Sequence, residues 1–304
     1  MRAVTKAKTR DHGAGQSAPP RPFAKWAGGK TWAVDYLSAI LPQGIDTYHE
    51  PMVGGGALFF ALAHAKRFRT AILSDTNREL MATYGALQDE RELEAVIELL
   101  RSYRNDKDMF LRMRAQDPTK LPAAAVAARM IFLNKTGFNG LYRVNTAGKF
   151  NVPFGKYTNP TLCDEANLRA VHAALTCGER RNDWPLLMRD DYVIAVEEAK
   201  PGDAVYFDPP YMPVSKTSNF TGYVPGGWKL ADHEKLAVCF AALAERGVAV
   251  VLSNSDSAAT RELYKKFDIR SVKARRSINS KAAGRGFVGE IVVVANCKTW
   301  SAPL

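Results

Sequence analysis

Residues 46–77 read DTYHEPMVGGGALFFALAHAKRFRTAILSDTN, and this stretch decides the fold class. The short run 46–50 is typical of a strand, and it leads into the glycine-rich turn 51–56. The spacing of apolar residues predicts a helix over 57–66 and a second strand over 70–73. The order of strand, glycine loop, helix and strand is that of the opening of a Rossmann-like α/β domain.

The glycine loop and the acid after the second strand predict a ligand site. Gly54, Gly55 and Gly56 allow a tight turn and a close approach of backbone to ligand, although a simple loop explains glycines alone equally well. Asp75 follows about 20 residues on, where a Rossmann site places an acid against ribose hydroxyls. Its oxygens accept the hydrogen bonds that a ribose donates, so an adenosine-containing ligand is expected. A dinucleotide is disfavoured because the loop is not GxGxxG. Ser74 or Asp75 is also placed to cap the next helix.

The pattern changes character after residue 85. Helices without an intervening strand are expected at 90–103, 106–115 and 122–134, followed by a loop at 138–160 and a helix at 164–175. This block is predicted to be a helical insertion, because a βαβ unit would place strands between its helices. The α/β alternation is expected before and after it, with strands at 186–188, 204–207, 248–252, 269–273 and 288–295, and helices at 31–41, 192–199, 231–245 and 257–266. The last two strands predict an antiparallel edge hairpin around a glycine-rich loop at 282–286.

The charge balance favours a polyanionic partner. The chain of 304 residues carries a formal net charge of +11 at pH 7, with 46% hydrophobic and 24% charged residues. The basic excess is dispersed, so a folded basic surface is expected, and nucleic acid is the usual partner of such a surface. A merely basic protein would show the same balance.

Membrane and metal partners are not expected. The apolar runs have the length of strands, far below a membrane span. Residues 1–20 are polar and basic, unlike a signal peptide, and are expected to form a flexible tail. The four cysteines show no zinc spacing and are expected to be reduced thiols of a cytosolic protein: Cys163, Cys177, Cys239 and Cys297.

The stretch DAVYFDPPY, residues 203–211, ends an apolar strand on a carboxylate. Asp208, Pro209, Pro210 and Tyr211 can be read as a simple strand end, since proline cannot continue a ladder. Ligands of a doubly wound sheet, however, lie beyond the carboxyl ends of its strands. There the Asp208 carboxylate and the rigid Pro209 carbonyl can accept both N–H bonds of an aromatic amine, while an exposed Tyr211 ring stacks on it. The predicted reaction is a direct displacement driven by positioning and electrostatics.

The segment FAKWAGGK, residues 23–30, is a further candidate for ligand contact. Trp26 offers a stacking face, and Lys30 is a mobile cation that can meet a carboxylate. The alternative is a loop before a helix with a tryptophan in the core.

Together these motifs resemble DNA adenine methyltransferases of the Dam type, the alpha group of the D12 class. Members of this family use S-adenosyl-L-methionine (SAM) to methylate the exocyclic amine of adenine. The resemblance rests on the order of KWAGGK at 25–30, EP-VGGG at 50–56, Asp75 with Asn77, and DPPY at 208–211, and it continues through 132–157, 215–223 and 275–279.

The resemblance implies roles for the matched positions. Trp26, Lys30, Asp75 and Asp208 match positions that contact SAM, with the loop of Gly54, Gly55 and Gly56 beside them. Asp208 and Pro209 match the acceptors of the target amine. Tyr211, after Pro210, matches the ring that stacks on the base.

The helical insertion resembles a target-recognition domain that reads duplex DNA. Phe138 matches an aromatic residue that enters the opened duplex, and Asn139 matches a position near the flipping site. The positions that read GATC bases match Leu141, Arg143 and Pro153, and Lys156 matches a basic position near phosphates. These assignments fit general physics, because arginine reads guanine in the major groove and a stacked base must be flipped out for chemistry. The alternative for Phe138 and Leu141 is a small local core, and the alternative for Asn139 and Gly140 is a turn.

The expected division is a tail at 1–20, a SAM-binding catalytic domain formed by 21–84 and 186–304, and a target-recognition domain at 85–185. The expected function is a site-specific DNA adenine N6-methyltransferase in a prokaryotic or phage-infected cytoplasm, monomeric or weakly dimeric, acting on double-stranded DNA without a metal. An RNA or protein-amide N-methyltransferase and a non-catalytic DNA-binding protein are the alternatives.

Overall fold

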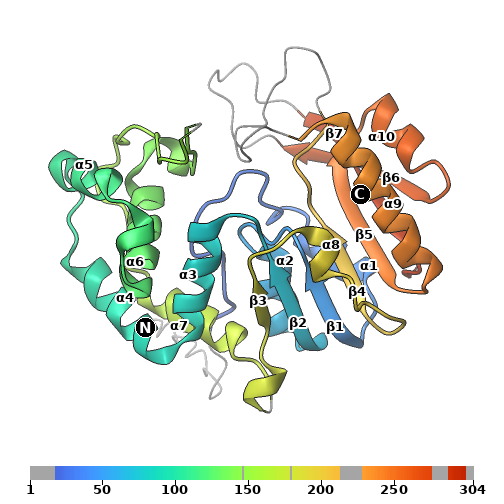
Figure 1. Ribbon diagram of the computed structural model, residues 1–304, viewed down its shortest axis with the longest axis horizontal. Helices are drawn as coiled ribbons and strands as arrows, with labels where there is room; N and C mark the ends of the chain where they lie inside the picture. Colours follow the sequence, from blue (N-terminus) through green and yellow to red (C-terminus); the bar gives the residue numbers. More distant parts are fainter. Residues whose placement is uncertain (1–17, 146, 179, 213–227, 276–286, 299–304) are drawn as a thin grey trace, which may run out of the picture.

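The computed structural model describes residues 18–145, 147–178, 180–212, 228–275 and 287–298. In these residues a seven-stranded sheet has the order β3 (Leu186–Met188), β2 (Phe68–Ser74), β1 (Ile45–Glu50), β4 (Ala204–Phe207), β5 (Ala249–Ser255), β7 (Phe287–Ala295) and β6 (Asp268–Arg275) (Figure 1). The strands from β3 to β5 pair in parallel, and β7 runs antiparallel to both of its neighbours. The Rossmann-like α/β class and the antiparallel edge hairpin are thus confirmed.

The helices alternate with the strands at both ends of the chain and follow one another in its middle. They are α1 (Val34–Ile40), α2 (Ala57–His64), α3 (Arg78–Gln88), α4 (Glu90–Ser102), α5 (Lys107–Ala115), α6 (Ala123–Thr136), α7 (Glu165–Leu175), α8 (Tyr192–Ala195), α9 (Leu230–Glu245) and α10 (Ala258–Leu263). Short 3-10 turns lie at Pro118–Lys120, Phe138–Gly140 and Arg181–Asp183. Among the described residues, helices α3 to α7 follow one another between β2 and β3 without an intervening strand; this helical block begins at Arg78, before the insertion predicted at 85–185.

Two local predictions are wrong. Helix α8 ends at Ala195, not at residue 199, and the following turns bond three residues back, as in the 3.1 Å bond from Ala199 N to Val196 O. Val196 and Ala199 continue the apolar spacing of the helix because both side chains are buried in the core, although their backbone is no longer helical. The cap of α3 is Asn77, whose side chain accepts the N–H of Leu80, instead of Ser74 or Asp75.

Each face of the sheet has its own hydrophobic core. Val205 and Phe207 of β4 pack with α9, whereas the alternating Ala204 and Tyr206 belong to the core on the other face. Side chains of a strand alternate between faces, so a strand buried on both sides reads as a continuous apolar run. This explains why β4 and β5 are fully buried and why β4 was predicted to the residue.

The helical block lies to one side of the sheet. Figure 1 shows α4, α5 and α6 beyond β3, with α3 between them and the sheet. Helix α3 packs against both β3 and α6, so the expected boundary between residues 84 and 85 falls inside a helix that both parts share. The division into two domains therefore stays a prediction.

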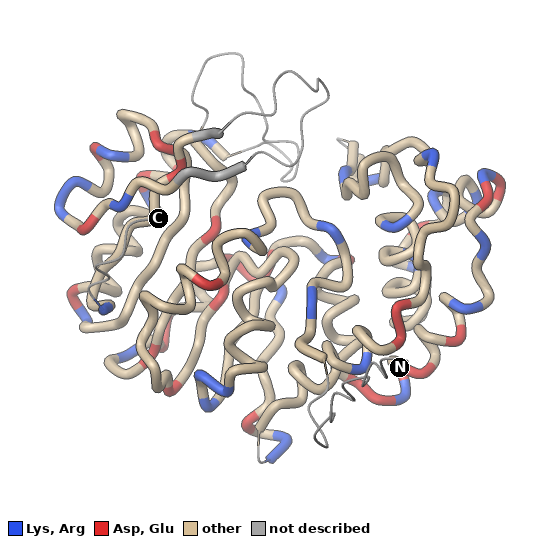
Figure 2. The backbone as a smooth tube through the Cα atoms, turned by 180° about the vertical axis from the view of Figure 1, so that it is seen from behind, with Lys and Arg blue, Asp and Glu red and all other residues tan. Residues whose placement is uncertain are grey.

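Several of the segments named in the sequence analysis lie outside the described residues. The tail up to residue 17, the segments 215–223 and 276–279 and the loop 282–286 lie outside the described residues. In the described part, no helix is long and apolar enough to cross a membrane, and no group of three or more His, Cys, Asp and Glu residues is arranged to hold a metal ion. Figure 2 shows Lys and Arg distributed over the sheet and the helical block, interspersed with acids.

Candidate active site

The candidate site lies where the sheet changes its direction of winding. From β1 the chain adds β2 and then β3 on one side, and it returns to place β4 on the other side of β1. The pairs Tyr48 with Ala204 and His49 with Val205 set β1 and β4 parallel and adjacent. The segments that follow the two strands therefore meet at one edge, which is the switch point where α/β sheets bind ligands.

The glycine loop packs against Trp26 and Asp75. Gly54 has a φ of 47°, and its N–H donates to Asp75 Oδ2 over 3.1 Å. A Cβ on Gly54 would lie 2.7 Å from Cδ1 of Trp26, and one on Gly55 would lie 3.2 Å from Cβ of Trp26. Gly56 also has a positive φ, of 66°. The loop, the indole and the acid, which the sequence placed in one site, are thus in direct contact.

Asp75 is held by two backbone N–H groups. Its Oδ1 accepts the N–H of Asn77 over 2.8 Å, and its Oδ2 accepts that of Gly54. Burial raises the pKa of Asp75 above its usual range, and the two N–H donors oppose this shift. Each carboxylate oxygen keeps a further lone pair, so Asp75 can still accept a hydroxyl donor.

Asp208 and Lys30 form an ion pair at the end of β4. The Lys30 ammonium lies 2.8 Å from both carboxylate oxygens, hydrogen-bonds Oδ2, and also donates to Gly28 O over 2.6 Å. Lys30 is 4% exposed, whereas Asp208 is 20% exposed. Burial raises the pKa of Asp208, and the charge of Lys30 lowers it, with burial the stronger cause. Among the described residues, Asp208 Oδ1 is engaged by the Lys30 ion pair and accepts no hydrogen bond, so it keeps lone-pair capacity for a donor.

Tyr211, the last residue of the DPPY motif, is less exposed than expected. Pro209 is buried, and Pro210 and Tyr211 are half-buried. The exposed position predicted for Tyr211 is wrong: the residue is half-buried, and its hydroxyl donates to Glu290 Oε2 of β7 over 2.8 Å. The ammonium of Lys30 lies 4.7 Å from the centre of the Tyr211 ring.

Glu50 is a buried acid to which the sequence assigned no role. It ends β1, and its Oε2 accepts the hydroxyl of Tyr48 over 2.9 Å and the N–H of Phe59 over 3.1 Å. Burial raises the pKa of Glu50 to about 8; the Tyr48 hydrogen bond opposes the shift, and the nearby Asp208 charge adds to it. A carboxyl at the end of a strand was the available signal, the same one that identified Asp208.

Two further residues of the site were missed. Asn254 is fully buried at the end of β5 and its Oδ1 accepts the N–H of Met212 over 3.0 Å. The polar run 253–255 on an otherwise apolar strand was a signal for it. Glu290 on β7 gives no such signal, since its proximity to Tyr211 depends on the long-range register between β7 and β5.

The predicted DNA-reading residues lie on and beside a hairpin-like loop. Bridges join Gly137 to Phe154 and Val144 to Phe150, and the N–H of Phe138 donates to Pro153 O over 2.9 Å. The side chain of Phe138 is 49% exposed. The other predicted positions divide into exposed and half-buried ones: Arg143, Pro153 and Lys156 are exposed, and Asn139 and Leu141 are half-buried.

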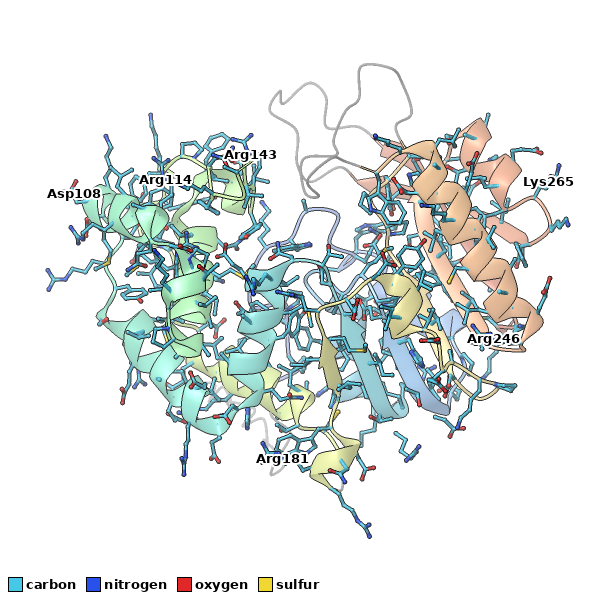
Figure 3. All side chains as sticks on the ribbon, viewed as in Figure 1. Asp108, Arg114, Arg143, Arg181, Arg246 and Lys265 are labelled. Atoms are coloured by element: carbon cyan, nitrogen blue, oxygen red, sulfur yellow. The ribbon has the colours of Figure 1, made fainter. Side chains whose placement is uncertain are left out.

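Arg143, which the sequence predicts to read a base, is exposed on this loop. Its Nε donates to Asn151 Oδ1 over 2.8 Å, and this hydrogen bond orients the guanidinium. Figure 3 places Arg143 near Arg114 at the top of the helical block, and Arg114 contacts the same loop at Val152 O. Leu141 is partly buried against the hydrophobic core, which agrees with its interpretation as a local core residue. Asn139 has a φ of 57°, which fits its turn interpretation.

The loop is joined to the edge of the sheet. Asn134 accepts the N–H of Lys25 and donates to the carbonyls of Lys25 and Gly140. The Tyr142 ring stacks on Trp26 with centroids 5.4 Å apart. The two groups of predicted residues are thus connected through the segment that carries Trp26 and Lys30.

The arrangement defines a Rossmann-like methyltransferase fold with an acid and a rigid acceptor at its switch point. Residues 26–278 match the profile of the D12 class N6 adenine-specific DNA methyltransferase family. The chain is 40% identical to the type II methyltransferase M1.LlaDCHI of Lactococcus lactis subsp. cremoris, over 90% of this chain and 94% of the relative. It is 37% identical to the type II methyltransferase M.MjaIII of Methanocaldococcus jannaschii, over 87% and 95%, and 34% identical to the DNA adenine methylase of Escherichia coli (strain K12), over 90% and 95%.

The chain therefore belongs to the D12 class of N6 adenine-specific DNA methyltransferases. It is an enzyme of DNA adenine methylation, as the resemblance predicted. This family match selects the DNA enzyme over the RNA, protein-amide and non-catalytic alternatives.

Proposed function

We propose that the enzyme transfers a methyl group from SAM to N6 of adenine in duplex DNA, at GATC, after flipping the adenine out of the helix. The observation that carries this proposal is the buried Asp208 Oδ1, which accepts no hydrogen bond among the described residues and lies beside the rigid Pro209. An exocyclic amine has two N–H donors, and this pair offers two acceptors.

The glycine loop, Trp26 and Asp75 hold the cosubstrate. Asp75 accepts the ribose hydroxyls, and the loop at Gly54 allows a close backbone approach. SAM supplies an activated methyl group on its sulfonium, which leaves S-adenosyl-L-homocysteine when the S–CH₃ bond breaks and the N6–CH₃ bond forms. Contact between Asp75 and the glycine loop supports this assignment of the pocket.

The catalytic residues act by positioning the amine. Asp208 and the Pro209 carbonyl accept its N–H bonds, which orients the nitrogen lone pair and increases its electron density. The Tyr211 ring stacks on the flipped base, and the proton that nitrogen loses passes to solvent or to Asp208. Lys30 now pairs with Asp208, so it shares that carboxylate with the amine when the base arrives.

The reading loop opens the duplex and recognises its bases. Phe138, with about half of its side chain exposed, fills the gap left by the flipped adenine. Arg143 reads a guanine, Leu141 and Pro153 contact neighbouring bases, Asn139 approaches the flipped base, and Lys156 contacts phosphate. The GATC assignment rests on the match of Leu141, Arg143 and Pro153 to the family's reading positions.

The experiment that tests the chemistry is methyl transfer by Asp208→Ala. The variant should lose transfer from labelled SAM to a GATC duplex, because one of two amine acceptors is gone, while its circular dichroism stays that of the folded protein. Competition among DNA, RNA and protein substrates should place the label in DNA. Near-normal turnover by the variant, or label in RNA or protein, would contradict the proposal.

A further inference from the structure

Tyr211 is held at its hydroxyl by a residue from a distant part of the chain. The hydroxyl donates to Glu290 Oε2 over 2.8 Å, across 79 positions of sequence. A hydrogen bond to a carboxylate is shorter and stronger than one between neutral groups. This contact fixes the far end of the ring, whereas packing alone would leave it freer to turn.

The main chain beside Tyr211 is fixed as well. Asn254 Oδ1 accepts the N–H of Met212 over 3.0 Å, and Ser255 Oγ donates to Met212 O over 2.6 Å. Both partners belong to β5 and are buried. The segment that begins at Asp208 is therefore held through its backbone by β5 and through its aromatic side chain by β7.

The antiparallel strand β7 is what brings Glu290 to this place. Glu290 pairs with Ser255 on β5 and with Val272 on β6. Because strand side chains alternate, a slip of one residue in this register would turn Glu290 to the opposite face and break its contact with Tyr211. The edge hairpin thus contributes a side chain to the site as well as closing the sheet.

We propose that Glu290 is a positioning residue for methyl transfer. It sets the plane of the Tyr211 ring on which the target adenine stacks, and so aligns the amine with Asp208 and Pro209. This inference rests on the proposed function. Its physical basis is that a small misplacement of reacting groups lowers the rate strongly without a comparable change in binding.

The first test compares Glu290→Ala and Glu290→Gln with the wild type in steady-state methylation of a duplex. The alanine variant should lower kcat by about 10- to 100-fold and change the KM for SAM little. The glutamine variant keeps an acceptor oxygen and should retain most of the rate. Asp268→Ala, on the neighbouring strand β6, is the matched control; it removes an exposed carboxylate that pairs with Arg270, and the variant should turn over normally.

The second test is a double-mutant cycle with Tyr211→Phe, which keeps the ring and removes its hydroxyl. If Glu290 acts through that hydroxyl, Glu290→Ala should add little to the loss already caused by Tyr211→Phe. Fully additive losses, or a normal kcat in Glu290→Ala, would overturn the inference and leave the proposed function standing. An equal loss in the glutamine and alanine variants together with lowered melting temperatures would show a structural role instead. A wild type that methylates no DNA would overturn the proposed function, and this inference with it.

Discussion

Asp208 has two conflicting requirements at the scale of the single residue. It accepts an amine N–H most strongly when it is ionised, yet burial raises its pKa. Lys30 opposes that shift from 2.8 Å, and the lysine is itself almost fully buried. Lys30 therefore favours the ionised carboxylate by pairing with it, and in doing so it occupies part of the acceptor that the substrate needs.

Replacing Lys30 with Gln should make methylation more sensitive to acid. Without the ammonium the pKa of Asp208 rises further, so the carboxylate is protonated at a higher pH and the acid limb of the kcat/KM profile moves upward. The loss relative to the wild type should therefore be larger at pH 6 than at pH 8.5, as measured with labelled SAM. An equal loss at both pH values would mean that Lys30 serves binding only.

Glu50 makes stability depend on pH in the opposite sense to a salt-bridged acid. Its pKa in the folded protein is about 8, above its usual 4.5, so the folded state binds the proton more tightly. The resulting stabilisation is present below about pH 4.5 and is lost as pH rises towards 8. Glu50→Gln should remove this dependence, so thermal melting of the variant relative to the wild type should improve between pH 5 and pH 8. A constant difference across that range would contradict the assignment.

At the scale of the element, we predict that Arg143, on the loop that follows α6, reads one base of the duplex. Arg143 is exposed on the loop that follows α6, which is closed by two isolated β-bridges. Arg143→Ala should weaken binding to the cognate duplex by about 1–3 kcal/mol and relax one base position. Arg181→Ala, which Figure 3 shows at the opposite end of the molecule, is the control and should bind normally. Uniform weakening over all sequences, measured by fluorescence anisotropy, would make Arg143 a phosphate contact.

Sequence patterns predicted elements where one local signal decided the structure. Strands β3 and β4 were predicted to the residue because a turn or a proline bounds each short apolar run. Helix α8 was predicted too long because buried residues continue the helical spacing in a turn. The cap of α3 was misassigned because Ser74, Asp75 and Asn77 are all capping residue types, and only tertiary contacts decide among them.

The site shows the same limit. Asp75 and Asp208 could be found because each ends a strand, and parallel strands end at a shared edge. The contact of Glu290 with Tyr211 could not be predicted, because the two residues are 79 positions apart in the sequence. The stack of Tyr142 on Trp26 could not be predicted either, because 116 positions (142 − 26) separate these residues. Only the register of the sheet and the packing of the helical block create those contacts.

At the scale of the whole molecule, a buried ion pair joins α6 to α3, the helix that also packs against β3 of the sheet. Arg129 of α6 donates to Glu79 of α3 over 2.6 Å and to Met113 O over 2.8 Å. Glu79 also accepts the hydroxyl of Tyr142, whose ring stacks on Trp26. One buried carboxylate thus connects α3, α6 and the loop that carries Tyr142 with the segment that carries Trp26.

Removing Arg129 should destabilise the protein strongly. Arg129→Met leaves the Glu79 carboxylate buried without its cation, which typically costs about 3–5 kcal/mol. Urea denaturation measures this loss as a fall in the free energy of unfolding. Lys265→Met removes an exposed pair with Glu262 and should leave stability nearly unchanged. Equal and small effects of both changes would show that the Arg129–Glu79 pair does not stabilise the fold.

The central claim is that this chain methylates adenine at GATC through Asp208. The most direct measurement is long-read sequencing of DNA from a host that lacks adenine methylation and expresses either the wild type or Asp208→Ala. The account predicts N6-methyladenine at nearly all GATC sites with the wild type and at none with the variant. Unmodified adenine with the wild type, modification at another sequence, or methylation by the variant would contradict it.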